Sequence, residues 1–321
     1  MLKEIFDYIY KNVSRVKITA AFIFLSVSFC GSLYAMSWPS GDAILFRNFG
    51  VNENGKPVLG MDFSGGTDIL AAESGEIIFT RSMNDSASRL PSPLGSWTAV
   101  DHGDGLISVY SRYNNQDVFP DVYNADSGVL PQTNPRSTLT YVGKNQRIAS
   151  SGSSGWSSHN GFFFMLYDRR ERRWINPAMI INPSQDTRPV QIVSVNLRNA
   201  QGQIVPVNNL TQGRYTVVVT IAGGSPLSVP LAQTGFYAPH VILCSVNGAE
   251  VGSLIFEAVS ARDGTLMVSR NGLVPARQIY AHPPSFEAAE VFLTRGQVTL
   301  EVIVQDISGV SRNIVSRFTV N

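Results

Sequence analysis

Residues able to hold a metal ion or to act as nucleophiles are few in this 321-residue chain, which contains four histidines and two cysteines. A catalytic zinc site needs three protein ligands and a bound water molecule. We interpret His102 as a turn residue, because it lies in a glycine-containing turn. His159 precedes an apolar run and is either a polar surface residue at a strand entrance or a metal ligand. We assign no role to His240 or His282, which lie in the C-terminal part of the chain.

The two cysteines give no sign of redox chemistry. Cys244 lies in an apolar, strand-like run at 240–246, and we expect a buried small hydrophobic residue rather than a reactive thiol. Cys30 lies in the N-terminal segment, so no intrachain disulfide forms if that segment is removed.

The composition is typical of a globular protein with a full core, with 44% hydrophobic and 15% charged residues. A formal net charge of +1 gives no global field that favours nucleic acid, so we expect no nucleic-acid partner. At roughly 100–200 residues per domain, the length predicts two domains.

The elements that would position these side chains are predicted to be strands, because no helical periodicity follows residue 37. In the first half we expect a hairpin around the turn at 102–105 and a long surface loop at 114–140. Asn-Pro pairs at 176–177 and 182–183 mark a domain boundary. The expected strands are 75–80, 97–101, 106–112, two short strands within 140–150, and 162–167.

The second half has about seven short strand candidates, a number typical of a β-sandwich of immunoglobulin-like architecture. Pro206 makes the second candidate an expected edge strand. The fold class is therefore all-β, with domains predicted at 37–182 and 188–321. The candidates are 190–197, 203–207, 214–221, 240–246, 253–259, 298–305 and 313–320.

The N-terminal segment, 1–35, has the parts of a secretory signal. Basic residues precede an uncharged apolar run at 18–29, and small residues follow up to Ala35, after which we expect cleavage. In one alternative, residues 18–36 stay as an inner-membrane anchor, since a span needs about 20 residues. In another, Cys30 is lipidated. Each alternative places residues beyond 37 outside the cytoplasm, in the periplasm or cell envelope.

Several short motifs follow one another between residues 56 and 180, namely Val58–Asp62, His102–Gly105, Tyr110–Arg112, Lys144–Gly155, and Gly161–Met165 with Asn176-Pro177. In order and spacing they resemble the lysostaphin/LytM-type peptidoglycan zinc endopeptidases, which have the duplicated hybrid motif fold. The family pattern H-x-G-x-D is similar to Val58–Asp62, its H-G-x-G turn to His102–Gly105, and its Y-x-H strand end to Tyr110–Arg112. Its later glycine-rich stretch resembles Lys144–Gly155, and its H-L-H-F-E strand with the following N-P resembles Gly161–Met165 with Asn176-Pro177. The resemblance implies a LytM-like antiparallel sheet in the first domain.

The resemblance places the zinc ligands at Val58, Asp62 and Phe163, and the histidines that handle the water and the oxyanion at Arg112 and Gly161. Only Asp62 is a possible ligand. Valine and phenylalanine donate no lone pair, and arginine stays protonated at neutral pH. Without zinc, nothing lowers the pKa of the attacking water towards 7. We therefore expect no catalytic residues and no cofactor, and zinc only if the site is rearranged.

Five residues are candidates for a ligand-binding groove, and each has a structural alternative. Asp62 accepts backbone hydrogen bonds at a strand end or contacts a ligand. Arg112 is an exposed arginine or binds a carboxylate of a peptide stem. Trp156 packs or stacks on a sugar ring. Phe163 belongs to a core strand or fills the metal pocket, and His159 is the remaining candidate.

The sequence predicts a non-catalytic cell-envelope protein that binds peptidoglycan or regulates a cell-wall hydrolase. One alternative is an active peptidoglycan zinc endopeptidase whose rearranged site uses Asp62 and His159. Another is a purely structural envelope component.

Overall fold

The structure is a computed structural model that describes residues 36–82, 92–114, 140–181, 190–223 and 237–321. The predicted signal or anchor, Cys30 and nearly all of the predicted 114–140 loop lie outside these residues. Residues 36–321 form one compact unit. The expected boundary near 182–188 also falls outside the described residues, so the two-domain division stays a prediction. In the described part of the chain, no helix is long and apolar enough to cross a membrane.

The fold is all-β and its strand pairs are antiparallel, as predicted. The first half contains β1 (Ile44–Arg47), β2 (Asn52–Glu53), β3 (Lys56–Pro57), β4 (Met61–Ser64), β5 (Asp68–Leu70), β6 (Gly75–Arg81), β7 (Ser96–Asp101), β8 (Leu106–Tyr113), β9 (Thr140–Val142), β10 (Arg147–Ser150), β11 (Gly161–Asp168), β12 (Arg173–Ile175) and the 3₁₀ helix η1 (Pro177–Met179).

The second half contains two more 3₁₀ helices and ten strands in its described residues. They are β13 (Val190–Asn199), β14 (Ile204–Val205), η3 (Val207–Asn209), β15 (Gly213–Gly223), β16 (Val241–Val246), β17 (Ala249–Arg262), β18 (Thr265–Arg270), β19 (Leu273–Pro275), η5 (Ala276–Gln278), β20 (Phe286–Leu293), β21 (Gly296–Gln305) and β22 (Ser311–Val320).

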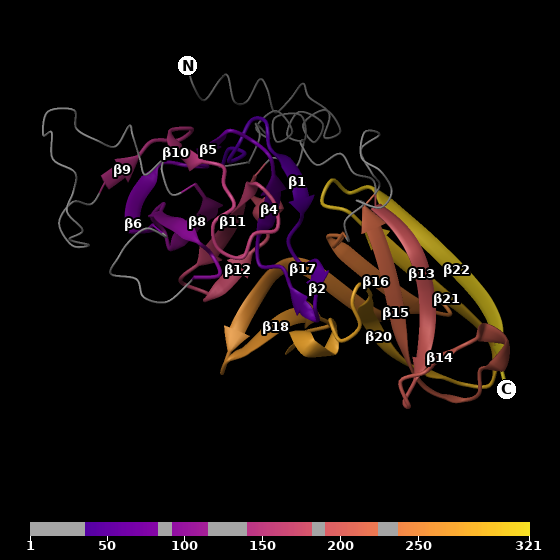
Figure 1. Cartoon of the computed structure of the whole chain (residues 1–321). Helices are drawn as coiled ribbons and strands as arrows, with labels where there is room; N and C mark the ends of the chain where they lie inside the picture. The colour runs from indigo at the N-terminus through magenta and orange to yellow at the C-terminus, as the bar shows by residue number, and fades with distance from the viewer. Residues whose placement is uncertain (1–35, 83–91, 115–139, 182–189, 224–236) are drawn as a thin grey trace, which may run out of the picture. The chain divides into compact units, whose positions relative to one another are not determined.

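The first-half sheet is built around β11, which pairs with β8 along one edge. Its other edge is shared, because β4 pairs with its first residues and β12 with its last. The order β11-β8-β7-β6-β9 then extends the sheet, and β1 lies outside β4 (Figure 1). The tight turn at 102–105 joins β7 to β8, as predicted from the sequence.

The second half consists of two sheets that pack face to face (Figure 1). One has the order β14-β13-β15-β20, and the other contains β22-β21-β16-β17. The short strand β14 lies at a sheet edge next to Pro206, as the proline predicted. The immunoglobulin-like character of this arrangement stays a prediction.

Side-chain alternation on β11 separates two hydrophobic cores. Phe162 and Phe164 are buried in a core formed by first-half residues alone. Phe163 and Met165 point to the opposite face, as strand geometry requires. They join a second core that also contains the inner residues of the second half, together with Val58. The face of the sheet that carries Phe163 is therefore continuous with the core of the second half.

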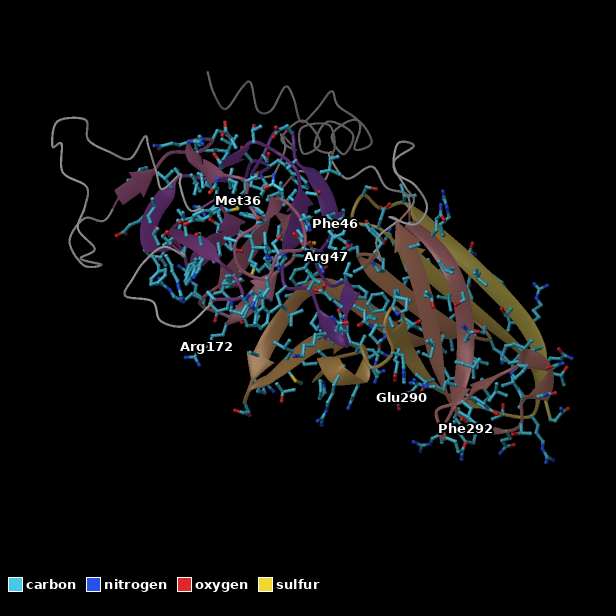
Figure 2. The ribbon with its side chains drawn as sticks, viewed as in Figure 1. Met36, Phe46, Arg47, Arg172, Glu290 and Phe292 are labelled. Atoms are coloured by element: carbon cyan, nitrogen blue, oxygen red, sulfur yellow. The ribbon has the colours of Figure 1, made fainter. Side chains whose placement is uncertain are left out.

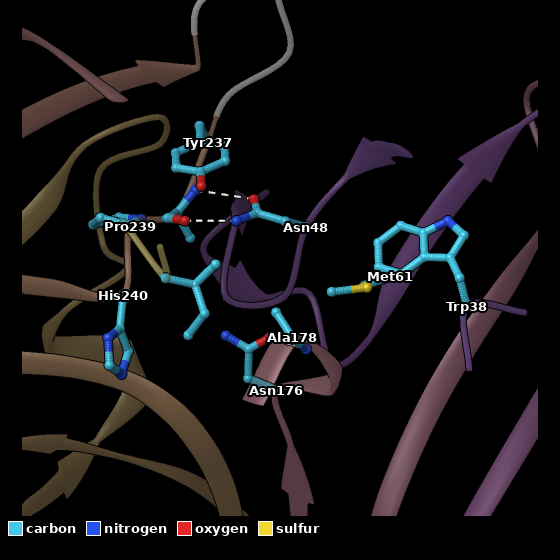
Figure 3. A pocket seen from close by; sticks show the side chains of 10 residues that line it. Trp38, Asn48, Met61, Asn176, Ala178, Tyr237, Pro239 and His240 are labelled. Carbon is cyan, nitrogen blue, oxygen red and sulfur yellow. Dashed lines mark hydrogen bonds between the residues drawn. The ribbon is translucent and has the colours of Figure 1, made fainter. Parts of the chain in front are cut away.

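The two halves are joined by backbone pairing and by a polar seam. β12 pairs with β17, so one sheet runs through both halves. The Asn48 side chain donates to Ala238 O at 2.6 Å and accepts from Ala238 N at 3.1 Å. These bonds border a cavity of about 20 Å³, room for roughly one water molecule (Figure 3). The segment between β1 and β4 is thus fixed against the second half.

Candidate functional site

One row of residues, held in register across six neighbouring strands, forms the centre of the site. The directly paired residues run from Arg81 on β6 through Trp97 on β7 to Ser111 on β8. They continue from Ser111 to Phe163 on β11, then to Asp62 on β4 and Arg47 on β1. Directly paired residues point to the same face of a sheet, so these side chains line one face over about 24 Å.

Asp62 is the electrostatic centre of this row. Its side chain is 0% exposed. Oδ2 accepts from Arg47 Nε at 3.0 Å, from Arg47 Nη2, and from Arg112 Nη1 at 3.1 Å. The expectation that backbone groups would bind this carboxylate was wrong, because the partners are guanidinium groups. A buried carboxylate is stable only when its charge is compensated, and here two cations compensate it.

Arg47 reaches Asp62 from a distorted edge strand. The β1–β4 register shifts between Leu45 and Arg47, so Phe46 is an extra residue in a β-bulge. Figure 2 shows Phe46 and Arg47 next to each other on β1. Arg47 donates to Asp62 from two nitrogens and to Glu53 Oε1 from the third. Its hydrogen-bonding capacity is thus used within the protein.

Arg112 reaches the same carboxylate from a second bulge. The β7–β8 register shifts so that Ser111 pairs with Trp97 and Tyr113 with Ser96, which leaves Arg112 extra. Its φ is +69°, in the left-handed region that non-glycine residues rarely adopt. Bulges re-aim side chains, and they are frequent next to functional sites. The side chain is 15% exposed, so the interpretation of Arg112 as an ordinary exposed arginine was wrong.

Phe163 forms the floor beneath Arg112. The guanidinium carbon of Arg112 lies 4.8 Å from the centroid of the Phe163 ring, in cation–π contact. Phe163 is nearly buried and belongs to the core that contains Val58. Position 163 therefore faces the site, where its ring contacts a guanidinium.

His159 closes the site on the β4 side. Its Nε2 lies 3.3 Å from Asp62 Oδ1 and 3.2 Å from Phe63 O. The ring stacks obliquely against Phe46, with centroids 4.8 Å apart. His159 is thus neither an isolated surface residue nor part of a larger ligand set.

Trp156 is 75% exposed, so the expectation that it packs was wrong. It lies two residues after Ser154, whose N–H donates to Arg112 O at 3.3 Å. A second aromatic feature on the row is the stacked pair Phe79 and Trp97, with centroids 4.3 Å apart. Phe79 is 44% exposed. Aromatic side chains are therefore accessible near the arginines.

These residues do not fit a catalytic zinc ion. Val58 and Phe163 offer no donor atom. At Gly161, an added Cβ would lie 1.9 Å from Phe63 O, so the backbone leaves no space for any larger side chain. Asp62 is engaged by two arginines and has His159 as its sole potential partner ligand. Among the described residues, no three His, Cys, Asp or Glu side chains come together.

The remaining chemically capable residues lie elsewhere. The His102 ring is held by Ser74 O at 2.8 Å and Ser108 Oγ at 2.7 Å, and burial lowers its pKa. This confirms a structural turn residue. Cys244 is a buried free cysteine, as expected, and burial raises its pKa to about 12. The charged run 168–173 forms the β11–β12 hairpin tip.

Sequence reasoning found Asp62, Arg112, His159 and Phe163, which the structure brings together. It missed Arg47 and its partner Glu53, as well as the stacked aromatic pair on β6 and β7. The signal for Arg47 is weak, because its pairing with Asp62 depends on a bulge in a four-residue strand.

Comparisons with known proteins give three results. A family profile matches residues 189–321. No curated protein matches the chain. Among solved structures, the catalytic domain of a prophage-encoded M23 protein from Enterococcus faecalis is 18% identical, with 44% of this chain and 95% of that chain covered and a TM-score of 0.32.

Two further solved structures belong to similar proteins. A zinc-containing peptidase from Vibrio cholerae is 16% identical over 42% of this chain and 37% of that chain, with a TM-score of 0.31. The catalytic domain of lysostaphin from Staphylococcus simulans is 21% identical over 39% of this chain and 77% of that chain, with a TM-score of 0.27.

Proposed function

We propose that this chain is a non-catalytic protein of the cell envelope whose first half binds peptidoglycan or a cell-wall hydrolase through a converted peptidase groove. The observation that carries the proposal is the contact of Asp62 with Arg47 and Arg112. Asp62 is the one of the three ligand positions implied by the resemblance whose side chain could bind zinc. Two guanidinium groups contact this carboxylate and supply the positive charge that a metal ion would supply.

The residues around Asp62 support the absence of hydrolysis by the family mechanism. That mechanism requires a polarised water molecule and a group that accepts its proton at neutral pH. Arg112 stands at one of the histidine positions and remains protonated. Gly161 stands at the other and has no functional group. The chain thus keeps the strands of the groove without the groups that carry out the reaction.

The cell-envelope part of the proposal rests on the sequence. The motif resemblance is to enzymes that act on peptidoglycan, and the N-terminal segment has the pattern of an export signal or membrane anchor. A periplasmic or envelope location, with peptidoglycan or a cell-wall hydrolase as the partner, follows from these two features together.

The test uses the purified full chain and isolated peptidoglycan sacculi. We expect the protein to pellet with sacculi, or to change the rate of a cell-wall hydrolase added to them, while the protein alone releases no soluble peptide or glycan fragments. Release of fragments that a chelator abolishes would overturn the proposal. Absence of both pelleting and any effect on hydrolases would favour a purely structural component.

One contact favours the alternative of a rearranged peptidase, namely the 3.3 Å distance between His159 Nε2 and Asp62 Oδ1. Two ligands fall short of the three that catalytic zinc sites use. If this alternative holds, Asp62→Ala and His159→Ala each abolish a chelator-sensitive cleavage of sacculi. If the proposal holds, neither variant differs from the parent chain in this assay, because none of the three proteins cleaves sacculi.

A further inference from the structure

We propose that Arg112 is an anchor for the free carboxylate of a peptide bound along the row that runs from Trp97 to Asp62. This inference rests on the proposed function and names the ligand class of the same groove. The site would thereby have changed from one that polarises a peptide bond to one that recognises a peptide terminus or an acidic side chain.

The charges at the site form an alternating chain with an anion at one end and a cation at the other. Glu53 pairs with Arg47, Arg47 with Asp62, and Asp62 with Arg112. The carboxylate of Asp62 is fully buried, whereas Glu53 is 47% exposed and Arg112 15% exposed. Arg112 is the end that lies beside Ser111 on the row, and its positive charge complements a carboxylate bound there.

Arg112 has a nitrogen without a hydrogen bond outside the buried part of its side chain, and Arg47 does not. Arg47 uses all three of its nitrogens on Asp62 and Glu53. Within the described residues, Arg112 donates from Nη1 to Asp62, its Nε is buried without a hydrogen-bond partner, and its Nη2 makes no hydrogen bond. A guanidinium group presents several N–H donors in one plane and pairs well with planar carboxylates. Arg47 is thus a structural counterion, and Arg112 remains able to bind a ligand.

The surroundings strengthen a charge pair at Arg112. The Phe163 ring lies under the guanidinium and excludes water from that side. Charge interactions are stronger where water is excluded. Trp97, which stacks on Phe79, pairs with Ser111 next to Arg112. Exposed Trp156 lies two residues after Ser154, whose N–H donates to Arg112 O. An extended peptide therefore has apolar surface near the arginine.

The backbone at Arg112 is consistent with a functional position. A non-glycine residue in the left-handed region costs free energy, and such residues concentrate at binding and catalytic sites. Other non-glycine residues with positive φ among the described residues lie in turns, whereas Arg112 lies within a strand. Its bulge directs the guanidinium towards Asp62 and over Phe163.

The experiment measures binding of two fluorescein-labelled tri-alanine peptides to the full chain by fluorescence polarisation. One peptide has a free C-terminal carboxylate and the other a C-terminal amide. A charge-assisted hydrogen bond predicts that the carboxylate peptide binds about tenfold more tightly or better. The preference should fall severalfold in Arg112→Lys, which keeps a cation opposite Asp62 and so protects folding, and it should disappear in Arg112→Gln.

The matched control is Arg170→Gln, a hairpin-tip arginine that pairs with exposed Asp104. This variant should keep the full preference. Equal binding of both peptides, or an unchanged preference in Arg112→Lys and Arg112→Gln, would overturn the inference. If sacculi still pellet the protein in that case, the proposed function stands and the carboxylate anchor alone is rejected. If sacculi do not pellet it and it does not change the rate of a cell-wall hydrolase, both are rejected.

Discussion

Asp62→Asn is the substitution that tests the charge arrangement around Asp62 most directly. The Asp62 side chain is 0% exposed and accepts from three guanidinium nitrogens of Arg47 and Arg112. Asparagine preserves the shape but removes the negative charge, leaving two cations around a neutral group. Removing one partner of a buried ion pair costs about 3–5 kcal/mol. For a unit of this size, that corresponds to a fall in Tm on the order of 10 °C.

The assay is thermal and urea unfolding of the full chain, with and without a chelator. Asp104→Asn is the matched control, because its side chain is 98% exposed and pairs only at the surface with Arg170. Such surface pairs contribute little. We expect a large decrease in the free energy of unfolding in Asp62→Asn and none in the control. The chelator should not change the free energy of unfolding of the parent chain. The reasoning is refuted if both variants unfold alike, or if the chelator destabilises the parent chain as much as Asp62→Asn does.

Three other predictions follow from single side chains. Burial lowers the pKa of His102, so the folded state favours the neutral imidazole. The contribution of His102 to the free energy of unfolding should therefore be fully present above pH 6.5 and should fall as the pH drops below that value. Urea unfolding between pH 5 and 7.5 should show this slope, which His102→Gln should reduce; an equal slope in both proteins would contradict it. Gly161→Ala should destabilise by at least about 1–3 kcal/mol through its clash with Phe63 O, whereas Gly41→Ala, with open space around it, should be tolerated in the same unfolding assay. Cys244 should resist thiol reagents at pH 8 until the protein unfolds, since burial raises its pKa to about 12; mass spectrometry of the Cys244 peptide checks this, and rapid labelling of the native protein would contradict it.

The strands that sequence reasoning found are those with strong apolar character. Phe162 to Phe164 predicted β11, and the two faces of that strand followed from alternation alone. β20 was missed because its sequence, from Phe286 to Leu293, is rich in alanine and glutamate, which have low β-propensity. It pairs with β15 as the end strand of the β14-β13-β15-β20 sheet, where Ala288 and Ala289 are buried. Residues 286–293 therefore form a strand because of their tertiary contacts and not because of the β-propensity of their local sequence.

The site shows a different limit of the sequence. The family motif identified Asp62 and Arg112 as equivalent to catalytic positions, and the structure brings both together. Neither the burial of Arg112 nor the role of Arg47 was predicted, because each depends on a β-bulge. A bulge adds one residue to one strand and leaves little trace in the pattern of side chains. The strand register is therefore fixed only in the folded sheet, and the register decides which side chain pairs with Asp62.

The most direct test of the central claim is a zinc titration of the purified full chain at pH 7, in competition with a chromophoric chelator. Zinc should stay with the chelator in the parent chain and in Asp62→Asn alike, because the Asp62 carboxylate is already paired with two guanidinium groups. Tight binding of one zinc ion per chain that is lost in Asp62→Asn and in His159→Ala would contradict it.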